Sequence, residues 1–200
     1  MSHPHLLETR LTSREVLRGS FLHAFQDQVA LPDGSSSVRE YIVHPGAAMV
    51  IALLPAKDGV VHVVLERQFR YPVNRVMVEF PAGKRDAAET SLVCAQRELR
   101  EETGYSAAEW AHAGQLHPTI AYSTECIDIW FARNLRLGAQ HLDAGEFLEV
   151  FTATPAELLT WCLDGTVTDG KTLAGALWLQ NVLSGAWSLD WQSSTPTNPV

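Results

Sequence analysis

Three glutamates stand close together near the middle of the chain: Glu98, Glu101 and Glu102 in the segment RELREETG. The segment is typical of a helix end, because Leu99 can face a core and Gly104 can adopt the left-handed conformation that stops a helix. On such a helix the three carboxylates share one face, where like charges repel each other. They also lie near the helix C-terminus, where the macrodipole favours cations.

A bound cation would explain this unfavourable arrangement. Clustered carboxylates without His or Cys suit Mg²⁺ or Mn²⁺ and suit zinc poorly. Arg97, beside the cluster, can hold one carboxylate in place, and Gly83 lets the backbone approach a ligand. The alternative is a solvated acidic helix end. The longer pattern over residues 83–105, G-x5-E-x7-R-E-L-x-E-E-x-G followed by Tyr105, in the order strand, loop, helix, favours the metal-dependent site.

The elements that would position this segment can be traced along the chain. After a loose leader over residues 1–13, hairpin-like strands are predicted over 16–41 around an Asp33–Gly34 turn, and over 49–55 and 60–69 around a turn at 57–59. Further strands are predicted over 76–80, 110–116, 127–132 and 147–153. Helices are predicted after Thr90 or Ser91, after Thr154, and after Asp169. This order predicts a mixed α/β or α+β domain.

Composition excludes several classes of protein. The 200 residues are 46% hydrophobic and 19% charged, which is typical of a chain with a core and not of a disordered one. The net charge of −8 and the lack of a Lys/Arg run argue against nucleic-acid or anionic-membrane binding. No signal peptide or membrane-spanning run is found. Three scattered cysteines without a CxxC motif indicate reduced thiols and a cytoplasmic protein.

The segment 83–105 resembles the Nudix box, the signature of hydrolases that cleave nucleoside diphosphates linked to another group. The resemblance implies an α/β/α sandwich around a mixed sheet, preceded here by an N-terminal antiparallel β segment. It further implies that Glu98 and Glu102 are the principal metal ligands, joined by the backbone carbonyl of Ala82. Glu101 would be a further ligand, directly or through water. Arg97 would orient the glutamates, and Glu89 would brace the loop.

The flanking segments are similar to the ADP-ribose pyrophosphatase branch of this family: residues 31–34 (LPDG), 43–53 (VHPGAAMVIAL), 66–73 (ERQFRYPV) and 78–84 (VEFPAGK). This implies hydrolysis of ADP-ribose to AMP and ribose 5-phosphate with Mg²⁺, for which Mn²⁺ can substitute. The alternatives are another nucleoside diphosphate sugar, such as GDP-mannose, or a non-catalytic nucleotide-binding module.

The same branch implies a homodimer built through the N-terminal strands. We therefore expect a dimerisation segment over residues 1–47, a Nudix domain over 48–187 and a flexible tail over 188–200. Phe21 and Phe25 are candidates to stack on adenine.

Two arginines and one glutamate before the box are candidate substrate-binding residues. Arg67 and Arg70 stand three residues apart at a strand end, where guanidinium groups could clamp a diphosphate. The alternative is that one or both pair with surface acids. Glu79 could contact the ligand or the metal's surroundings, or pair with an arginine.

Two segments after the box complete the expected site. In residues 117–125 (HPTIAYSTE), Pro118 and Glu125 match the substrate loop of the branch, but a glycine found in many relatives is absent. Glu125 is therefore a candidate substrate contact. In residues 142–150 (LDAGEFLEV), Glu146 is the candidate general base, with Asp143 as the alternative. Glu149 fits a strand residue that pairs with a cation.

Overall fold

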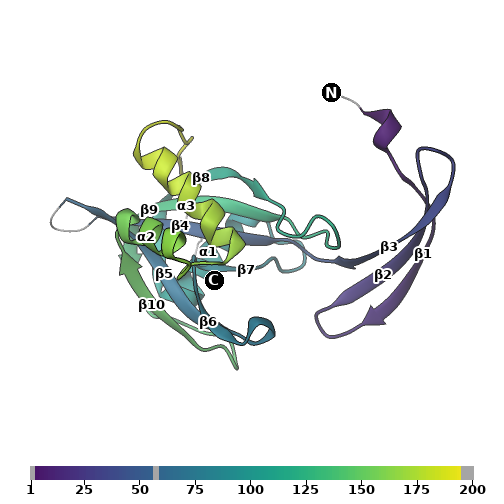
Figure 1. The fold of residues 1–200 in the computed structure, drawn as a ribbon. Coiled ribbons are helices and arrows are strands. Elements are labelled where there is room, and N and C mark those ends of the chain that lie inside the picture. The colour runs from purple at the N-terminus through teal and green to yellow at the C-terminus, as the bar shows by residue number, and fades with distance from the viewer. Residues whose placement is uncertain (1–2, 56–58, 195–200) are drawn as a thin grey trace. The chain divides into compact units, whose positions relative to one another are not determined.

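The computed structural model describes residues 3–55 and 59–194, which divide into two units (Figure 1). The first unit holds the chain up to Gly46 together with His117–Cys126. Its core element is a three-stranded antiparallel sheet in the order β1 (Thr9–Arg18), β2 (His23–Ala30) and β3 (Ser36–Val43), preceded by a 3-10 turn at Pro4–Leu6.

Two expectations for this unit can be compared with the structure. The Asp33–Gly34 turn is present, since the Asp33 carboxylate accepts hydrogen bonds from Ser35 and Gly34 has a φ of 85°. The loose leader over residues 1–13 is wrong beyond residue 8, because β1 begins at Thr9, whose pairing partner on β2 is Ala30. Strand pairing with a distant segment orders residues whose own sequence carries no strong strand pattern.

The second unit contains one large mixed sheet. Its strands follow the order β10-β5-β4-β9-β8-β11, with β6 paired to β5 and β7 paired to β4. Strands β4 and β9 are parallel and the other pairs are antiparallel. The bounds are β4 (Ala47–Pro55), β5 (Val61–Arg70), β6 (Arg75–Glu79), β7 (Ala82–Lys84), β8 (Tyr105–Leu116), β9 (Ile127–Leu137), β10 (Leu148–Ala153) and β11 (Gln192–Ser193); a 3-10 turn at Tyr71–Val73 joins β5 to β6.

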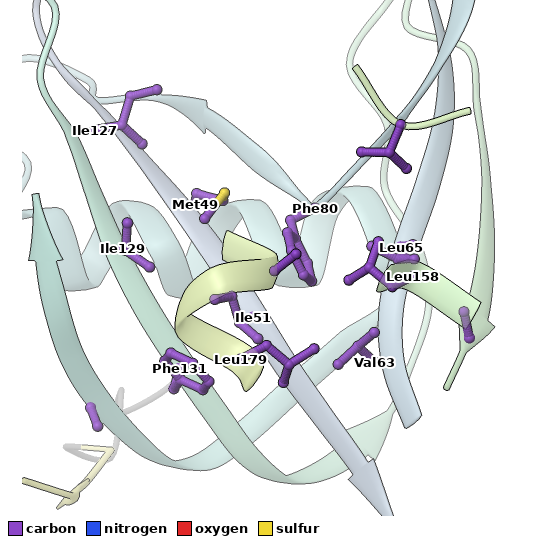
Figure 2. Close-up of a cluster of buried hydrophobic side chains, with 14 of the residues drawn as sticks. Met49, Ile51, Val63, Leu65, Phe80, Ile127, Ile129, Phe131, Leu158 and Leu179 are labelled. Atoms are coloured by element: carbon purple, nitrogen blue, oxygen red, sulfur yellow. The ribbon is translucent and has the colours of Figure 1, made fainter. Parts of the chain in front are cut away.

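Helices cover both faces of this sheet. Strand β4 is buried on both sides, and its residues alternate between two hydrophobic clusters. Ala48 and Val50 pack with α1 (Ser91–Thr103) on one face. Met49 and Ile51 belong to the cluster on the other face, which includes residues of α2 (Pro155–Asp164) and α3 (Gly170–Leu183) and is drawn in Figure 2. The expected α/β/α sandwich with a mixed sheet is thus confirmed.

The helix starts read from the sequence are also confirmed. Thr90 caps α1 by accepting a hydrogen bond from the backbone N–H of Val93, and Thr154 with Glu157 forms the capping box of α2. Asp169 caps α3. Gly104 ends α1 with a φ of 75°, as expected for a left-handed helix stop.

Several boundaries differ from the sequence expectation. Strand β8 begins at Tyr105 and β9 continues to Leu137, because these two residues pair with each other across the sheet. Within the segment expected to be flexible, β11 pairs with β8, while residues 195–200 lie outside the described residues. The turn expected at 57–59 lies partly outside them as well. In the described part of the chain, no helix is both long and apolar enough to cross a bilayer.

Candidate functional site

Gly83, in the middle of β7, lies against the Glu98 carboxylate of α1. An alanine methyl group built on Gly83 would lie 1.9 Å from Oε1 and 2.0 Å from Cδ of Glu98. The hydrogen side chain of glycine therefore creates the notch in which this carboxylate lies. Glu98 and Glu102, four residues apart on α1, are 9% and 3% exposed. The strand residue that begins the segment 83–105 is thus packed against the helix that carries its glutamates.

Arg97 links the glutamates of this segment to the loop. Its guanidinium donates to Glu89 at 3.0 Å through two nitrogens, to Glu98 at 2.8 Å and to Glu101 at 3.2 Å. It also donates to the backbone carbonyl of Lys84 at 2.9 Å. Hydrogen bonding to Arg97 lowers the pKa of Glu89 and keeps it ionised. The arginine therefore holds the acidic residues of the loop and helix in a fixed arrangement.

The two buried glutamates of α1 are energetically unfavourable as anions. Burial raises the pKa of Glu98 to about 7, against the opposing effect of Arg97. Burial, then the charges of Glu66, Glu98 and Glu146, raise the pKa of Glu102 well above its ordinary value, although the backbone N–H of Ala82 donates to its carboxylate at 3.0 Å. A positive charge brought to this place would favour the ionised forms of both groups.

Glu66 on β5, which was not among the residues predicted for the site, lies within electrostatic reach of Glu102. Its side chain is 0% exposed, and neither carboxylate oxygen has a hydrogen-bond partner. Burial and the nearby charge of Glu79 raise the pKa of Glu66 to about 8. The sequence does contain a signal for this residue. In a strand over 60–69, Glu66 lies on the same face as Val64, and a charge among apolar residues is costly unless it has a function.

Arg70, the last residue of β5, and Glu79, the last residue of β6, form an ion pair. The Arg70 guanidinium donates to both Glu79 oxygens, at 2.7 and 2.9 Å, and Lys171 from α3 also contacts Glu79. Burial alone would raise the pKa of Glu79, but Arg70 and Lys171 outweigh it and lower that pKa. Of the alternatives for Glu79, the structure shows the pairing with an arginine.

The structure does not bring Arg67 to the box. Its guanidinium donates to Glu149 on β10 at 2.9 Å and stacks at 3.8 Å on the ring of Phe151. Consecutive residues of a strand point to opposite faces, so Arg67 points away from the face that carries Glu66. Of the two alternatives for Arg67, the structure thus shows the pairing with a surface acid.

Glu125 lies in the first unit and forms an ion pair with His44 at 3.8 Å. Its role in substrate binding therefore stays a prediction.

Glu146 lies near the buried glutamates. Its carboxylate accepts from the side-chain amide of Gln68 and from the backbone N–H of Asp143, each at 3.3 Å. Its charge contributes to the raised pKa values of Glu66, Glu98 and Glu102. Thus the candidate base, from the loop before β10, lies within electrostatic reach of the helix that carries the box.

The donor set suits a hard divalent cation. Within residues 3–55 and 59–194, no three His, Cys, Asp or Glu side chains already converge as a metal site would require. Three observations still fit such an ion: carboxylates buried with raised pKa values, a pair of unpartnered oxygens on Glu66, and the notch at Gly83. All the side-chain donors are oxygens, as Mg²⁺ and Mn²⁺ prefer.

Comparisons with known proteins identify the family of this chain. A family model described as NUDIX domain matches residues 43–174, and one described as nucleoside diphosphate sugar hydrolase N-terminal domain matches residues 8–42. The chain is 32% identical to an ADP-ribose pyrophosphatase of Bacillus subtilis, over 88% of this chain and 94% of that protein. It is 33% identical to a methanol dehydrogenase activator of Bacillus methanolicus, over 86% and 92%.

A solved structure titled as an ADP compounds hydrolase shares the fold, with a TM-score of 0.78. It is 20% identical, and the match covers 90% of this chain and 97% of that one.

Proposed function

We propose, from the premise that this chain belongs to the Nudix hydrolase family, that it hydrolyses the diphosphate bond of ADP-ribose to AMP and ribose 5-phosphate. The observation that carries the proposal is the burial of Glu98 and Glu102 beside Gly83, an arrangement that suits a divalent cation. The substrate is supported by the ADP-ribose pyrophosphatases of Bacillus subtilis and Mycobacterium tuberculosis, which are 32% and 30% identical over most of this chain.

We assign the cation as Mg²⁺, with Mn²⁺ as a substitute. Glu98, Glu102 and the backbone carbonyl of Ala82 would hold it, with Glu101 as a further ligand. When bound, the ion supplies charge neutralisation for the diphosphate and lowers the pKa of a water molecule. Arg97 keeps Glu98 and Glu101 in place through its hydrogen bonds at 2.8 and 3.2 Å.

The remaining chemistry falls to residues around the carboxylates. Glu146 accepts a proton from the attacking water as an oxygen–phosphorus bond forms and the bridging phosphorus–oxygen bond breaks. Gln68 and the Asp143 N–H hold Glu146 in position for this step. Arg70, whose side chain is 40% exposed while it pairs with Glu79, presents positive charge to the diphosphate. Glu125 remains a proposed substrate-binding residue.

A second candidate substrate is another nucleoside diphosphate sugar, such as GDP-mannose. The match of residues 8–42 to a nucleoside diphosphate sugar hydrolase N-terminal domain supports this class. The same carboxylates would serve, because the diphosphate is common to both substrates. Only the groups that contact the base and the sugar would differ.

A substrate panel tests these proposals. ADP-ribose, GDP-mannose and dinucleotides are incubated with Mg²⁺ or with EDTA, and released phosphate monoesters are quantified by chromatography. We expect AMP from ADP-ribose with Mg²⁺ only, and loss of turnover in Glu98→Gln and Glu102→Gln. Glu109→Gln, which removes a carboxylate from the β8–β9 pair, is the control. Full turnover in both box variants would overturn the metal assignment. Binding with Mg²⁺ and no product would support a non-catalytic module.

We also propose a homodimer formed through the N-terminal strands, within residues 1–47, and a cytoplasmic location. The β1–β3 sheet exposes several large apolar side chains, which supports a protein partner: Leu11, Val16, Leu17 and Val38 are 42–58% exposed. Cys94 and Cys162 form no disulfide, which fits a reducing compartment. Light scattering after gel filtration measures the molar mass and so the oligomeric state, and a species with the mass of one chain would refute the dimer.

A further inference from the structure

Glu66 occupies a position in the sheet where water does not reach it. Strand β5 is paired on both sides at this residue, with Val150 of β10 and Glu79 of β6 as the direct neighbours. Directly paired residues point to the same face, so Glu66 shares its face with Val150, which packs in the cluster beneath α1. The side chain is 0% exposed. Glu66 therefore points from the sheet toward the layer that carries Glu98 and Glu102.

The protein supplies no partner for this carboxylate. Both oxygens are buried without a hydrogen bond, which is costly for a polar group and more so for a charged one. The two cations nearest to it, Arg70 and Lys171, are both engaged with Glu79. The other charged residues that act on it are acidic: Glu79 at the end of β6, Glu146 before β10, and Glu102 on α1. In a protein without a ligand, burying an aliphatic or amide side chain at this position would cost less free energy than burying a carboxylate.

We propose that Glu66 is an additional ligand of the divalent cation, reaching it from the sheet while Glu102 reaches it from α1. The inference rests on the proposed function, because it requires that the box glutamates hold a cation. Glu66 comes from a strand outside the box, so it would tie the cation to the sheet as well as to the helix. Its two free oxygens are the donors that a hard cation would use.

The test measures cation binding without substrate. Mn²⁺ is titrated into the full chain, and the free ion is followed by electron paramagnetic resonance. We expect Glu66→Gln to weaken Mn²⁺ binding at least about tenfold. The same variant should melt in EDTA at the wild-type temperature or above it, because glutamine cannot become a buried charge without a partner. The rise in melting temperature on adding Mn²⁺ should shrink. Glu109→Gln, with the same charge change outside the site, should bind as wild type does.

The outcomes separate this inference from the proposed function. If Glu102→Gln weakens Mn²⁺ binding and a folded Glu66→Gln binds as wild type does, Glu66 is no ligand and only this inference fails. If wild type binds no Mn²⁺, both fail. A lower melting temperature in EDTA with unchanged affinity would mean a purely structural role. Glu66→Asp keeps the charge but shortens the reach, so weakened binding there supports ligation even if the glutamine variant does not fold.

Discussion

Replacing Gly83 by alanine should separate catalysis from stability. The added methyl group would lie 1.9 Å from Glu98 Oε1 and 2.5 Å from Oε2, far inside ordinary contact distance. The carboxylate would have to withdraw by about 1.5 Å to restore van der Waals contact. A displacement of about 1 Å at a reacting centre can cost about 100-fold in rate. We therefore expect the rate of ADP-ribose hydrolysis to fall by about 100-fold or more.

Stability should change little in the same variant. Gly83 lies in extended backbone that alanine also adopts, so alanine lowers the entropy of the unfolded chain and stabilises by about 0.4–1 kcal/mol. Loss of the Glu98 hydrogen bond to Arg97 costs about the same, and Arg97 keeps Glu89 and the Lys84 carbonyl as partners. The melting temperature in EDTA should therefore stay within about 2–4 °C of wild type.

Gly170→Ala is the matched control. Gly170 has no atom within 4 Å of the position of an added methyl group, and it lies in the first turn of α3. That variant should hydrolyse ADP-ribose at the wild-type rate. The assays are steady-state release of AMP over a Mg²⁺ titration and thermal unfolding in EDTA. Wild-type turnover in Gly83→Ala, with an unchanged Mg²⁺ requirement, would refute the argument that the notch positions Glu98.

Three further predictions concern stability. In EDTA, the free energy of unfolding should fall as the pH rises from about 5 to about 8. The reason is that burial raises the pKa of Glu98 to about 7 and of Glu66 to about 8, so the folded chain keeps protons that the unfolded chain has released. A free energy of unfolding that rises with pH, measured by urea titration, would contradict this. Thr172→Val leaves the buried Phe80 N–H without its partner at 3.2 Å and should cost about 1–3 kcal/mol by urea unfolding. Thr154→Ala removes the cap of α2 and should cost about 1 kcal/mol while hydrolysis stays at the wild-type rate.

Local features of the site could be predicted from the sequence because they depend on nearby residues. The glutamates of α1 are spaced by the helical repeat, so their shared face follows from the chain alone. The helix start at Thr90 and the stop at Gly104 follow from side-chain capping and from the left-handed backbone that glycine allows. The apolar run over residues 49–55 likewise predicted a strand, and it lies within β4. These features need no knowledge of distant partners.

The partners of the charged side chains could not be predicted in this way. Arg67 and Arg70 have the same residue type and lie three positions apart, yet one pairs with Glu149 and the other with Glu79. Strand alternation and sheet register decide this, since Arg67 points to the opposite face of β5 from Glu66. The contact of Lys171 with Glu79 joins residues from α3 and β6, far apart in the chain.

Glu66 shows the difference between a residue that the sequence can mark as unusual and a position that only the fold decides. By itself the sequence determined a helix with clustered carboxylates, a glycine before it and the divalent cation these favour. Only the tertiary structure placed a fourth acidic residue, from β5, on the side of the sheet that α1 covers, buried and without a partner. The physical reason is that burial and charge proximity depend on which strands pair and which helix covers them. The spacing of residues along the chain does not contain that information.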